Sequence, residues 1–212
     1  MSGRGRRKQV VVGVTGASGA VYARRLVDCL CNAGADVHLV VTPHGKRLLN
    51  DELGLSEVSV RTLLGRDCDQ VIIHPYRDVG ARIGSGSFKT DGMIVCPCSS
   101  NTLASIAAGL ADNLLDRAAA VTLKEGRRLI VVPREMPASR IDLLNALRLS
   151  ESGAIICPGS PGFYMLPTTI EDLVDFVVGK LLDLLDVPHD LNTRWADRLD
   201  ALLKPTRTTD DA

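Results

Sequence analysis

The sequence predicts an α/β fold: a three-layer sandwich around a doubly wound parallel sheet, formed as a single domain. Short runs of β-branched residues alternate with helical patterns along the chain, with no linker or repeat between them. Most of these short runs are almost continuously apolar, as parallel strands covered on both faces are. With 212 residues, 45% of them hydrophobic, the chain is long enough to bury roughly 70% of its unfolded surface.

Each element follows from its own local pattern. Strands are expected over 9–15, 36–42, 70–74, 92–97, 128–133 and 154–158, and helices over 18–34, 100–111, 114–126, 139–153 and 169–187. Gly34 and Gly153 end two of these helices, and Thr169 precedes acidic residues at the start of the last one. The apolar residues of that last helix cover more than one stripe, which favours packing against a second subunit, so a homo-oligomer is expected.

Composition excludes several function classes. The 25 basic and 25 acidic residues cancel, which argues against nucleic-acid binding, and no apolar run reaches the roughly 18 residues of a membrane span. The six cysteines show no metal-ligand spacing, so reduced thiols, a cytoplasmic location and no metal site are expected. Residues 1–8 are interpreted as a disordered basic tail, 9–195 as the folded domain and 196–212 as a C-terminal tail.

The first strand leads into a glycine loop that contains Gly13, Gly16 and Gly19. Glycines at a strand-to-helix junction allow a backbone to approach a phosphate closely. Their spacing is GxxGxxG, however, and not the GxGxxG of dinucleotide sites. Thr42 stands at the end of the second strand, where such enzymes place an acid, so NAD is disfavoured. A threonine hydroxyl there can donate to a phosphate oxygen or to a flavin.

Polar residues also follow two further strands. Ser99, Ser100, Asn101 and Thr102 open the helix after the fourth strand, and Arg134 and Glu135 follow the fifth. These serines either cap their helix or bind a ligand at the same sheet edge as Ser18. Charged residues directly after a buried strand are costly unless they are paired or used.

Other charged and aromatic positions allow two interpretations each. Arg117 and Lys124 are seven residues apart and share a helix face, which is either solvated or functional. Lys180 lies in an apolar helix, where it either extends to solvent or holds an anion. Tyr164 lies in the loop after the sixth strand.

Four segments resemble the signature sequences of the UbiX/Pad-type flavin prenyltransferases. They are GVTGASGA, PCSSNTLASIAAGLADNLLDRAA, LKEGRRLIVVPRE, and PGFY followed by EDLVDFVV, and the likeness extends over about 10–195. The resemblance implies a Rossmann/flavodoxin-like, FMN-binding fold assembled as a dodecamer, with active sites at subunit junctions. It also implies transfer of a dimethylallyl group from dimethylallyl monophosphate to N5 and C6 of reduced FMN. The product, prenylated FMN, would serve a UbiD-type decarboxylase.

The resemblance also implies roles for individual residues. FMN is expected to contact Gly16, Ala17, Ser18, Thr42, Ser99, Ser100, Asn101, Thr102 and Arg134. The prenyl phosphate is expected at Tyr164 and Lys180, surrounded by Arg117, Lys124 and Glu135, and Glu52 matches an acid near the flavin. Preorganised cations would stabilise the departing phosphate, while Glu135 and Ser18 would transfer protons. No DDxxD motif occurs, which suits a donor that needs no metal.

Two positions depart from the family pattern. Lys180 replaces a common arginine and lacks its bidentate fork, so donor affinity is expected to fall. Val79 stands where some relatives carry an aromatic residue near the prenyl tail, so the tail pocket is expected to have a different shape or to be completed by another subunit.

Two alternatives are an FMN-dependent cysteine-type decarboxylase and a non-catalytic FMN carrier. The decarboxylases use a histidine a fixed distance before the SNTLAS segment and a PxMN element after the next strand. Here His74 is too far upstream, and PREMP stands in place of PxMN. A carrier would not require Lys124, Glu135 or Tyr164, which are all present.

Overall fold

The chain folds around a six-stranded, all-parallel sheet with the strand order β3-β2-β1-β4-β5-β6. The computed structural model describes residues 6–191 and 193–194. The strands are β1 (Gln9–Val14), β2 (Asp36–Val41), β3 (Val71–His74), β4 (Gly92–Cys98), β5 (Leu129–Pro133) and β6 (Ile155–Ile156). The first three strands are added toward one side of the sheet and the last three toward the other, so the switch point lies between β1 and β4. Ligands of doubly wound folds bind beside this point.

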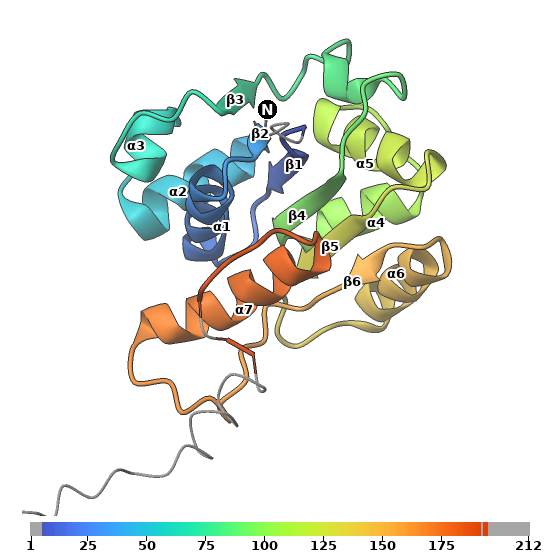
Figure 1. The fold of residues 1–212 in the computed structure, drawn as a ribbon. Coiled ribbons are helices and arrows are strands. Elements are labelled where there is room, and N and C mark those ends of the chain that lie inside the picture. Colours follow the sequence, from blue (N-terminus) through green and yellow to red (C-terminus); the bar gives the residue numbers. More distant parts are fainter. Residues whose placement is uncertain (1–5, 192, 195–212) are drawn as a thin grey trace, which may run out of the picture.

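Helices cover both faces of the sheet, as Figure 1 shows. α1 (Ala20–Asn32), α2 (Pro43–Leu53), α3 (Val60–Leu64) and α7 (Ile170–Leu184) contribute to the core on one face. α4 (Ser100–Ala107), α5 (Leu114–Lys124) and α6 (Arg140–Glu151) contribute to the core on the other. The expected three-layer, doubly wound α/β fold is therefore confirmed.

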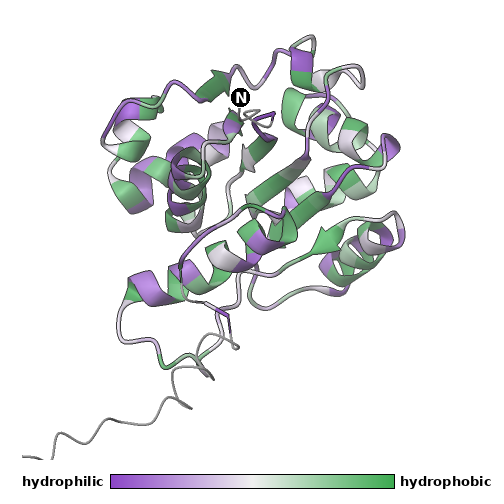
Figure 2. Cartoon of the chain, in the orientation of Figure 1, coloured by the Kyte–Doolittle hydropathy of each residue, from purple (hydrophilic) through white to green (hydrophobic). Residues whose placement is uncertain are grey.

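Apolar strands form the centre of both cores. β1 is buried from Val10 to Val14, and all seven residues of β4 are buried. Figure 2 shows the central strands in green, while the helices carry purple residues along their outer surfaces. The short 3₁₀ helix η1 (Arg82–Gly84) lies beside α5 and adds Ile83 to the second core.

Most elements are shorter than their patterns predicted, although β4 extends one residue further, to Cys98, and two helices were not expected. The sixth strand is only Ile155–Ile156, and α4 ends at Ala107, because Ala108 caps it just before Gly109 takes a left-handed φ of 73°. α2 and α3 fill the connection between β2 and β3, where the apolar spacing was too weak to predict a helix.

One cysteine expectation is wrong. Cys31, near the end of α1, and Cys68, just before β3, form a disulfide, whereas reduced thiols were predicted throughout. Their separation of 37 residues carries no recognisable signal, because folding alone brings the end of α1 beside this loop. Cys96 and Cys98 are free and buried, and burial raises the pKa of both thiols, so they stay neutral.

Both ends of the chain lie partly outside the described residues. Of the predicted basic tail 1–8, the structure describes only Arg6, Arg7 and Lys8; Arg6 pairs with Asp91 at 2.7 Å, and Lys8 donates to the Leu185 carbonyl. The predicted tail 196–212 lies outside the described residues. Within the described part, no helix combines the length and apolarity needed to cross a bilayer.

Candidate active site

The β1–α1 loop presents a row of backbone donors at the carboxyl edge of the sheet. Gly16, Ala17 and Ser18 have no hydrogen-bond acceptor for their backbone N–H groups within the described residues. Thr15 ties this loop to β4, because its hydroxyl donates to the Pro97 carbonyl at 2.8 Å and accepts from the backbone N–H of Ser99, also at 2.8 Å. Successive free N–H groups of this kind form an anion-binding concavity.

Gly16 lies against the start of α2. A Cβ at this position would come within 2.6 Å of the His44 Cβ, so a larger residue cannot occupy it without a shift of the backbone. This explains why the middle glycine of GxxGxxG matters. His44 is a residue that the sequence analysis did not single out; it is the second residue of α2, after the Thr42 cap that follows β2.

Glu52, from the last turn of α2, caps the start of α1. Its carboxylate accepts from the backbone N–H of Gly19 at 3.0 Å and from that of Ala20 at 2.8 Å. A negative charge at a helix N-terminus is favourable, so this contact stabilises the glycine loop. The structure therefore places Glu52 at the expected loop in a capping position.

Two of the expected ligand hydroxyls also cap helices. Thr42 is buried, and its Oγ1 accepts from the Gly45 N–H at 2.9 Å, which leaves the hydroxyl proton free to donate. Ser99 caps α4, where its hydroxyl accepts from the Thr102 N–H at 3.4 Å and donates to the Thr102 hydroxyl at 3.2 Å. The capping interpretation of Ser99 is thus what the structure shows.

The first turn of α4 keeps further donors available. The backbone N–H groups of Ser100 and Asn101 find no acceptor among the described residues, as is usual for the first positions of a helix. The Ser100 hydroxyl donates to Glu135 Oε2 at 3.1 Å. This bond connects the start of α4 to the loop after β5.

Arg134 and Glu135 complete this edge of the sheet. Arg134 Nε donates to the Ser18 carbonyl at 3.2 Å, and its backbone N–H donates to the Cys98 carbonyl at 3.3 Å. Arg134 therefore joins the glycine loop to β4, at the sheet edge where contact with FMN is expected of it. Glu135 is exposed, and its Oε1 accepts from the backbone N–H of Met136 at 3.3 Å.

These residues fit a flavin nucleotide. Backbone donors from the glycine loop and from α4, the Thr42 hydroxyl and the Arg134 guanidinium come together at one edge, and Gly16 leaves no room for a side chain beside them. Such a donor-rich surface suits an anionic ligand. Among the residues described, no group of three or more His, Cys, Asp or Glu side chains is arranged to hold a metal ion.

Two of the predicted cations, Arg117 and Lys124, are carried by α5. Lys124 ends α5, just before β5 begins, so it lies at the amino edge of the sheet, opposite Arg134. Its ammonium is 3.9 Å from Glu125. Arg117, one turn into α5, donates from Nε to the Gly84 carbonyl at 3.0 Å. Within the described residues, no hydrogen bond or ion pair joins either cation to Ser18, Arg134 or Glu135.

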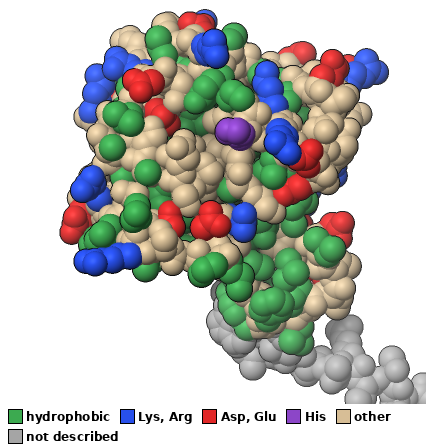
Figure 3. Space-filling model, turned by 180° about the vertical axis from the view of Figure 1, so that it is seen from behind, with side chains coloured by type: hydrophobic (Ala, Val, Ile, Leu, Met, Phe, Trp, Pro, Cys, Tyr) green, Lys and Arg blue, Asp and Glu red, His purple; other side chains and the backbone are tan. Residues whose placement is uncertain are grey.

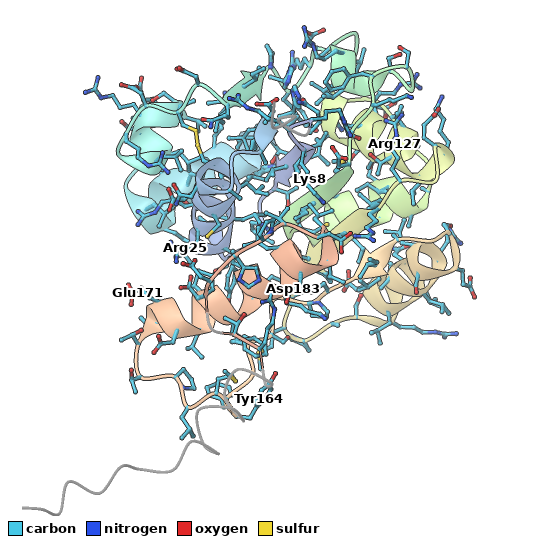
Figure 4. All side chains as sticks on the ribbon, in the orientation of Figure 1. Lys8, Arg25, Arg127, Tyr164, Glu171 and Asp183 are labelled. Carbon is cyan, nitrogen blue, oxygen red and sulfur yellow. A yellow bond between two sulfur atoms is a disulfide. The ribbon has the colours of Figure 1, made fainter. Side chains whose placement is uncertain are left out.

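Tyr164 and Lys180 occupy two further places. Tyr164 lies on the arm between β6 and α7, half exposed, with its ring edge-on to Phe176 at 5.5 Å. Figure 4 shows Tyr164 at one end of the molecule and Arg127, three residues after Lys124, near the other. Lys180 is exposed on α7, near Cys157: burial raises the pKa of that thiol, and the lysine charge opposes this shift.

Known proteins share this sequence and fold. The sequence model of the Flavoprotein family matches residues 2–182. A flavin prenyltransferase UbiX from Halalkalibacterium halodurans is 47% identical over 193 residues, which cover 89% of this chain and 94% of that protein. A second, from Thermoplasma acidophilum, is 47% identical over 189 residues, covering 88% of this chain and 99% of that protein.

Solved structures agree with these sequence matches. The crystal structure of AnUbiX in complex with FMN and dimethylallyl pyrophosphate has a TM-score of 0.82 and 41% identity, covering 90% of this chain and 98% of that one. The crystal structure of a dodecameric FMN-dependent UbiX-like decarboxylase from Escherichia coli has a TM-score of 0.80 and 43% identity. The match covers 88% of this chain and 98% of that one. The chain therefore belongs to the flavoprotein family and, within it, to the UbiX-type flavin prenyltransferases.

Proposed function

We propose that this protein transfers a dimethylallyl group from dimethylallyl monophosphate to N5 and C6 of reduced FMN. The observation that carries the proposal is the donor-rich edge where Arg134 meets Ser18 and Ser100 meets Glu135. The donors of such an edge can bind an anionic nucleotide, and the Glu135 carboxylate would lie next to that nucleotide. Prenylated FMN would be passed to a UbiD-type decarboxylase.

Residues of this edge would hold the flavin nucleotide. Gly16, Ala17 and Ser18 would donate backbone N–H groups, and Thr42 would donate its hydroxyl proton. When bound, the reduced flavin supplies the nucleophilic atoms of the reaction. Ser18 and Glu135 are the groups of this chain that would exchange protons beside it.

Cations would complete the site from neighbouring copies. Breaking an allylic C–O bond leaves a phosphate whose charge requires fixed positive groups. Within the described chain, Lys124 lies at the edge opposite Ser18, Arg117 is bonded to the Gly84 carbonyl, and Tyr164 lies on the projecting arm. Contact between copies would bring these residues, together with Lys180, to the flavin edge.

Exposed apolar residues support such an assembly, and we propose a dodecamer. The arm carries Phe163 and Leu166, and α7 begins with Ile170; each of the three is about 70% exposed. Figure 3 shows apolar side chains gathered on this arm. A second apolar surface lies on α6, where Ile141 and Leu144 are 70% and 52% exposed. Surfaces of this kind mark protein interfaces, so light scattering is the direct test of oligomer size.

One assay tests the activity. The purified protein is incubated anaerobically with reduced FMN and with either dimethylallyl monophosphate or dimethylallyl pyrophosphate. The mass of the released flavin is then measured by mass spectrometry. A mass increase by one dimethylallyl group supports the proposal. Unmodified flavin, in the presence of an active control enzyme, rejects it, and loss of CO₂ from a cysteinyl peptide supports the decarboxylase alternative.

A variant separates catalysis from binding. Glu135→Gln is expected to slow turnover more than it weakens FMN binding, because the amide cannot exchange a proton in the same way. Equal losses of turnover and binding would make Glu135 a structural residue. If the protein is a non-catalytic FMN carrier, the wild type and Glu135→Gln should both bind flavin, and neither should modify it.

A cytoplasmic location remains a prediction. The Cys31–Cys68 disulfide counts against the expectation of reduced thiols, because disulfides are rare in cytosolic proteins of most organisms. Alkylation of thiols in intact cells, followed by mass spectrometry of the peptides that contain Cys31 and Cys68, would determine the redox state.

A further inference from the structure

Thr15 directly precedes the free backbone donors of the glycine loop, yet its own side chain faces the interior. The residue is only 1% exposed. Its hydroxyl donates to the Pro97 carbonyl and accepts from the Ser99 backbone N–H, both at 2.8 Å. The single proton of this hydroxyl is therefore used within the protein, and the side chain is too deeply buried to contact a ligand itself.

The two hydrogen bonds lie just beyond the point where β1 and β4 stop pairing. The last paired residues of these strands are Gly13 and Val95, and Pro97 has no N–H with which to continue the ladder. The Thr15 backbone N–H also donates to the Pro97 carbonyl, at 3.3 Å. Thr15 therefore continues the connection between the two strands past the end of their ladder, at the switch point of the sheet.

Free backbone donors lie on both sides of this connection. One group consists of the N–H groups of residues 16–18, directly after Thr15, and the other of those of residues 100–101, directly after Ser99. Neither group has an acceptor among the described residues. Because each group follows a residue that takes part in the Thr15–Ser99 hydrogen bond, the Thr15 hydroxyl determines how the two groups lie relative to each other.

The far end of the glycine loop is fixed separately. Glu52 accepts from the backbone N–H groups of Gly19 at 3.0 Å and Ala20 at 2.8 Å. Residues 16–18 therefore form a short segment between two anchored points. Donors that are held in place before a ligand arrives do not have to be ordered when it binds, and this favours affinity.

We infer that Thr15 is a positioning residue for FMN. Its hydroxyl holds the donors of the glycine loop and those of α4 at the spacing that the nucleotide requires. It acts through the Pro97 carbonyl and the Ser99 N–H, without touching the flavin. The inference rests on the part of the proposed function that places FMN at this edge, and it does not depend on prenyl transfer.

Replacement of the hydroxyl is the first test. Thr15→Val exchanges it for a methyl group of similar size and removes both hydrogen bonds. The partly buried Ser99 N–H then lacks its acceptor, so the start of α4 should move relative to the loop, and the Kd for FMN should rise about tenfold. Quenching of the fluorescence of oxidised FMN measures the Kd without a prenyl donor.

Two further variants vary the hydrogen bond while keeping a polar group. Thr15→Ser retains the hydroxyl and should bind FMN within about twofold of the wild-type affinity. Thr15→Cys carries a weaker donor and acceptor, so its Kd should lie between those of Thr15→Ser and Thr15→Val. If Thr15→Val does not fold, the order of Thr15→Ser and Thr15→Cys still decides. Equal affinities of all the variants that fold would overturn the inference.

Thr122 provides a matched control. It is 2% exposed, lies in the last turn of α5, and donates its hydroxyl proton to the Ala118 carbonyl at 2.7 Å. Thr122→Val is thus the same substitution at an equally buried threonine with a hydrogen bond of its own. It should lower the thermal stability and leave the Kd for FMN unchanged. Equal losses of FMN affinity in Thr122→Val and Thr15→Val would show a general effect of destabilisation and contradict the assigned role.

Steady-state kinetics separate positioning from a loss of folded protein. In Thr15→Val, the KM for reduced FMN should rise about tenfold, while kcat at saturating FMN and the KM for the prenyl donor keep their wild-type values. A fall in kcat without a rise in the KM for FMN would mean that active protein is lost, and the inference would be wrong.

The binding and turnover measurements distinguish the two claims. If the wild type binds FMN but transfers no prenyl group, the proposed activity fails, and a weaker Kd in Thr15→Val still supports the role of Thr15. If prenyl transfer occurs but Thr15→Val binds FMN as tightly as the wild type, Thr15 only joins two strands, and the inference is wrong.

Discussion

Glu52 shapes the glycine loop through hydrogen bonds to its backbone. Its carboxylate bonds the backbone N–H groups of Gly19 and Ala20, and Gly19 has a φ of 117°, a conformation that glycine adopts at little cost. The charge at the start of α1 thus holds the loop that carries Ser18. A catalytic role, expected from the family resemblance, is a separate property and requires a separate measurement.

Glu52→Gln should lower the free energy of unfolding by about 0.5–1.5 kcal/mol, because the amide accepts hydrogen bonds more weakly and carries no charge for the helix N-terminus. Denaturant unfolding measures this change. Asp51→Asn is the control: Asp51 is the adjacent acid, exposed, and its one ion pair among the residues that the structure describes is with Arg47 at 3.4 Å. A fall in turnover greater than the fall in flavin affinity would favour the catalytic role.

His38 makes the stability of the fold depend on pH. It is 2% exposed, and its Nδ1 lies 2.9 Å from His74 Nε2. Burial lowers the pKa of His38 from 6.5 to about 4; the charges of His74 and Arg82 add to this shift, and Asp36 opposes it. The folded protein therefore keeps His38 neutral over a pH range in which the same histidine takes up a proton in the unfolded chain.

The free energy of unfolding should fall as the pH is lowered from about 6.5 to about 4, by at most about 3 kcal/mol from this residue. The sign follows because the unfolded state binds more protons in that range. Urea unfolding at pH 7.5 and pH 5 measures the difference. His38→Gln cannot titrate and should show a smaller difference, and an equal difference in both proteins would exclude His38 as its source.

Residue types were easier to predict than residue roles. Ser99 and Thr42 lie at the expected sheet edge, yet both hydroxyls accept from backbone N–H groups of their own helices. Sequence cannot distinguish a cap from a ligand because both need a short polar side chain at the same position.

At the scale of elements, the site depends on the close approach of the β1–α1 loop to α2. Gly16 lies against the His44 Cβ, an atom that cannot rotate away as the end of a long side chain could. This contact determines how closely the glycine loop approaches the start of α2. Because of this contact, even the addition of one methyl group at Gly16 should displace the loop.

Gly16→Ala should raise the Kd for FMN about tenfold while the protein remains folded, since relieving the contact displaces the loop and overpacking of this kind costs about 1–3 kcal/mol. Titration of flavin fluorescence measures the affinity, and thermal unfolding checks the fold. Gly80→Ala is the control, because a Cβ there would meet only Asp78, at 3.6 Å. Equal flavin affinity for Gly16→Ala and Gly80→Ala would contradict the assigned contact.

Element prediction succeeded where periodicity was strong. The long apolar runs became β1, β2, β4 and β5, within two residues of their expected bounds. α2 was missed because its segment, PHGKRLLNDEL, has few apolar residues and starts with proline and glycine in its first turn. That helix begins at the Thr42 cap and ends at Gly54 with a φ of 69°, two local signals that outweigh its weak apolar pattern.

On the scale of the whole molecule, local sequence patterns predicted the fold, whereas only the family resemblance predicted active sites at subunit junctions. Alternating strands and helices imply one sheet with its loops at one edge, and Ser18, Ser99 and Arg134 lie there. Lys124 is at the opposite edge, because α5 runs antiparallel to the strands and ends before β5. Local sequence patterns carry no information on which copy of a chain supplies a residue.

Mixed oligomers should reveal this sharing of residues between copies. Chains with Lys124→Ala and chains with Arg134→Ala are co-expressed under different tags, and oligomers that contain both are purified. If a site takes Arg134 from one copy and Lys124 from its neighbour, random mixing restores both residues in about a quarter of the sites. Prenyl transfer should then recover to about a quarter of the wild-type rate.

The matched control pairs Arg134→Ala with Ser18→Ala. These residues share one edge of one chain, since Arg134 Nε bonds the Ser18 carbonyl at 3.2 Å. Each site therefore takes both from the same copy, and no mixture of the two variants contains a site with both residues intact. Activity in this control, or none with the Lys124→Ala mixture, would show that the division of the site between copies is wrong, because only residues from different chains can complement each other.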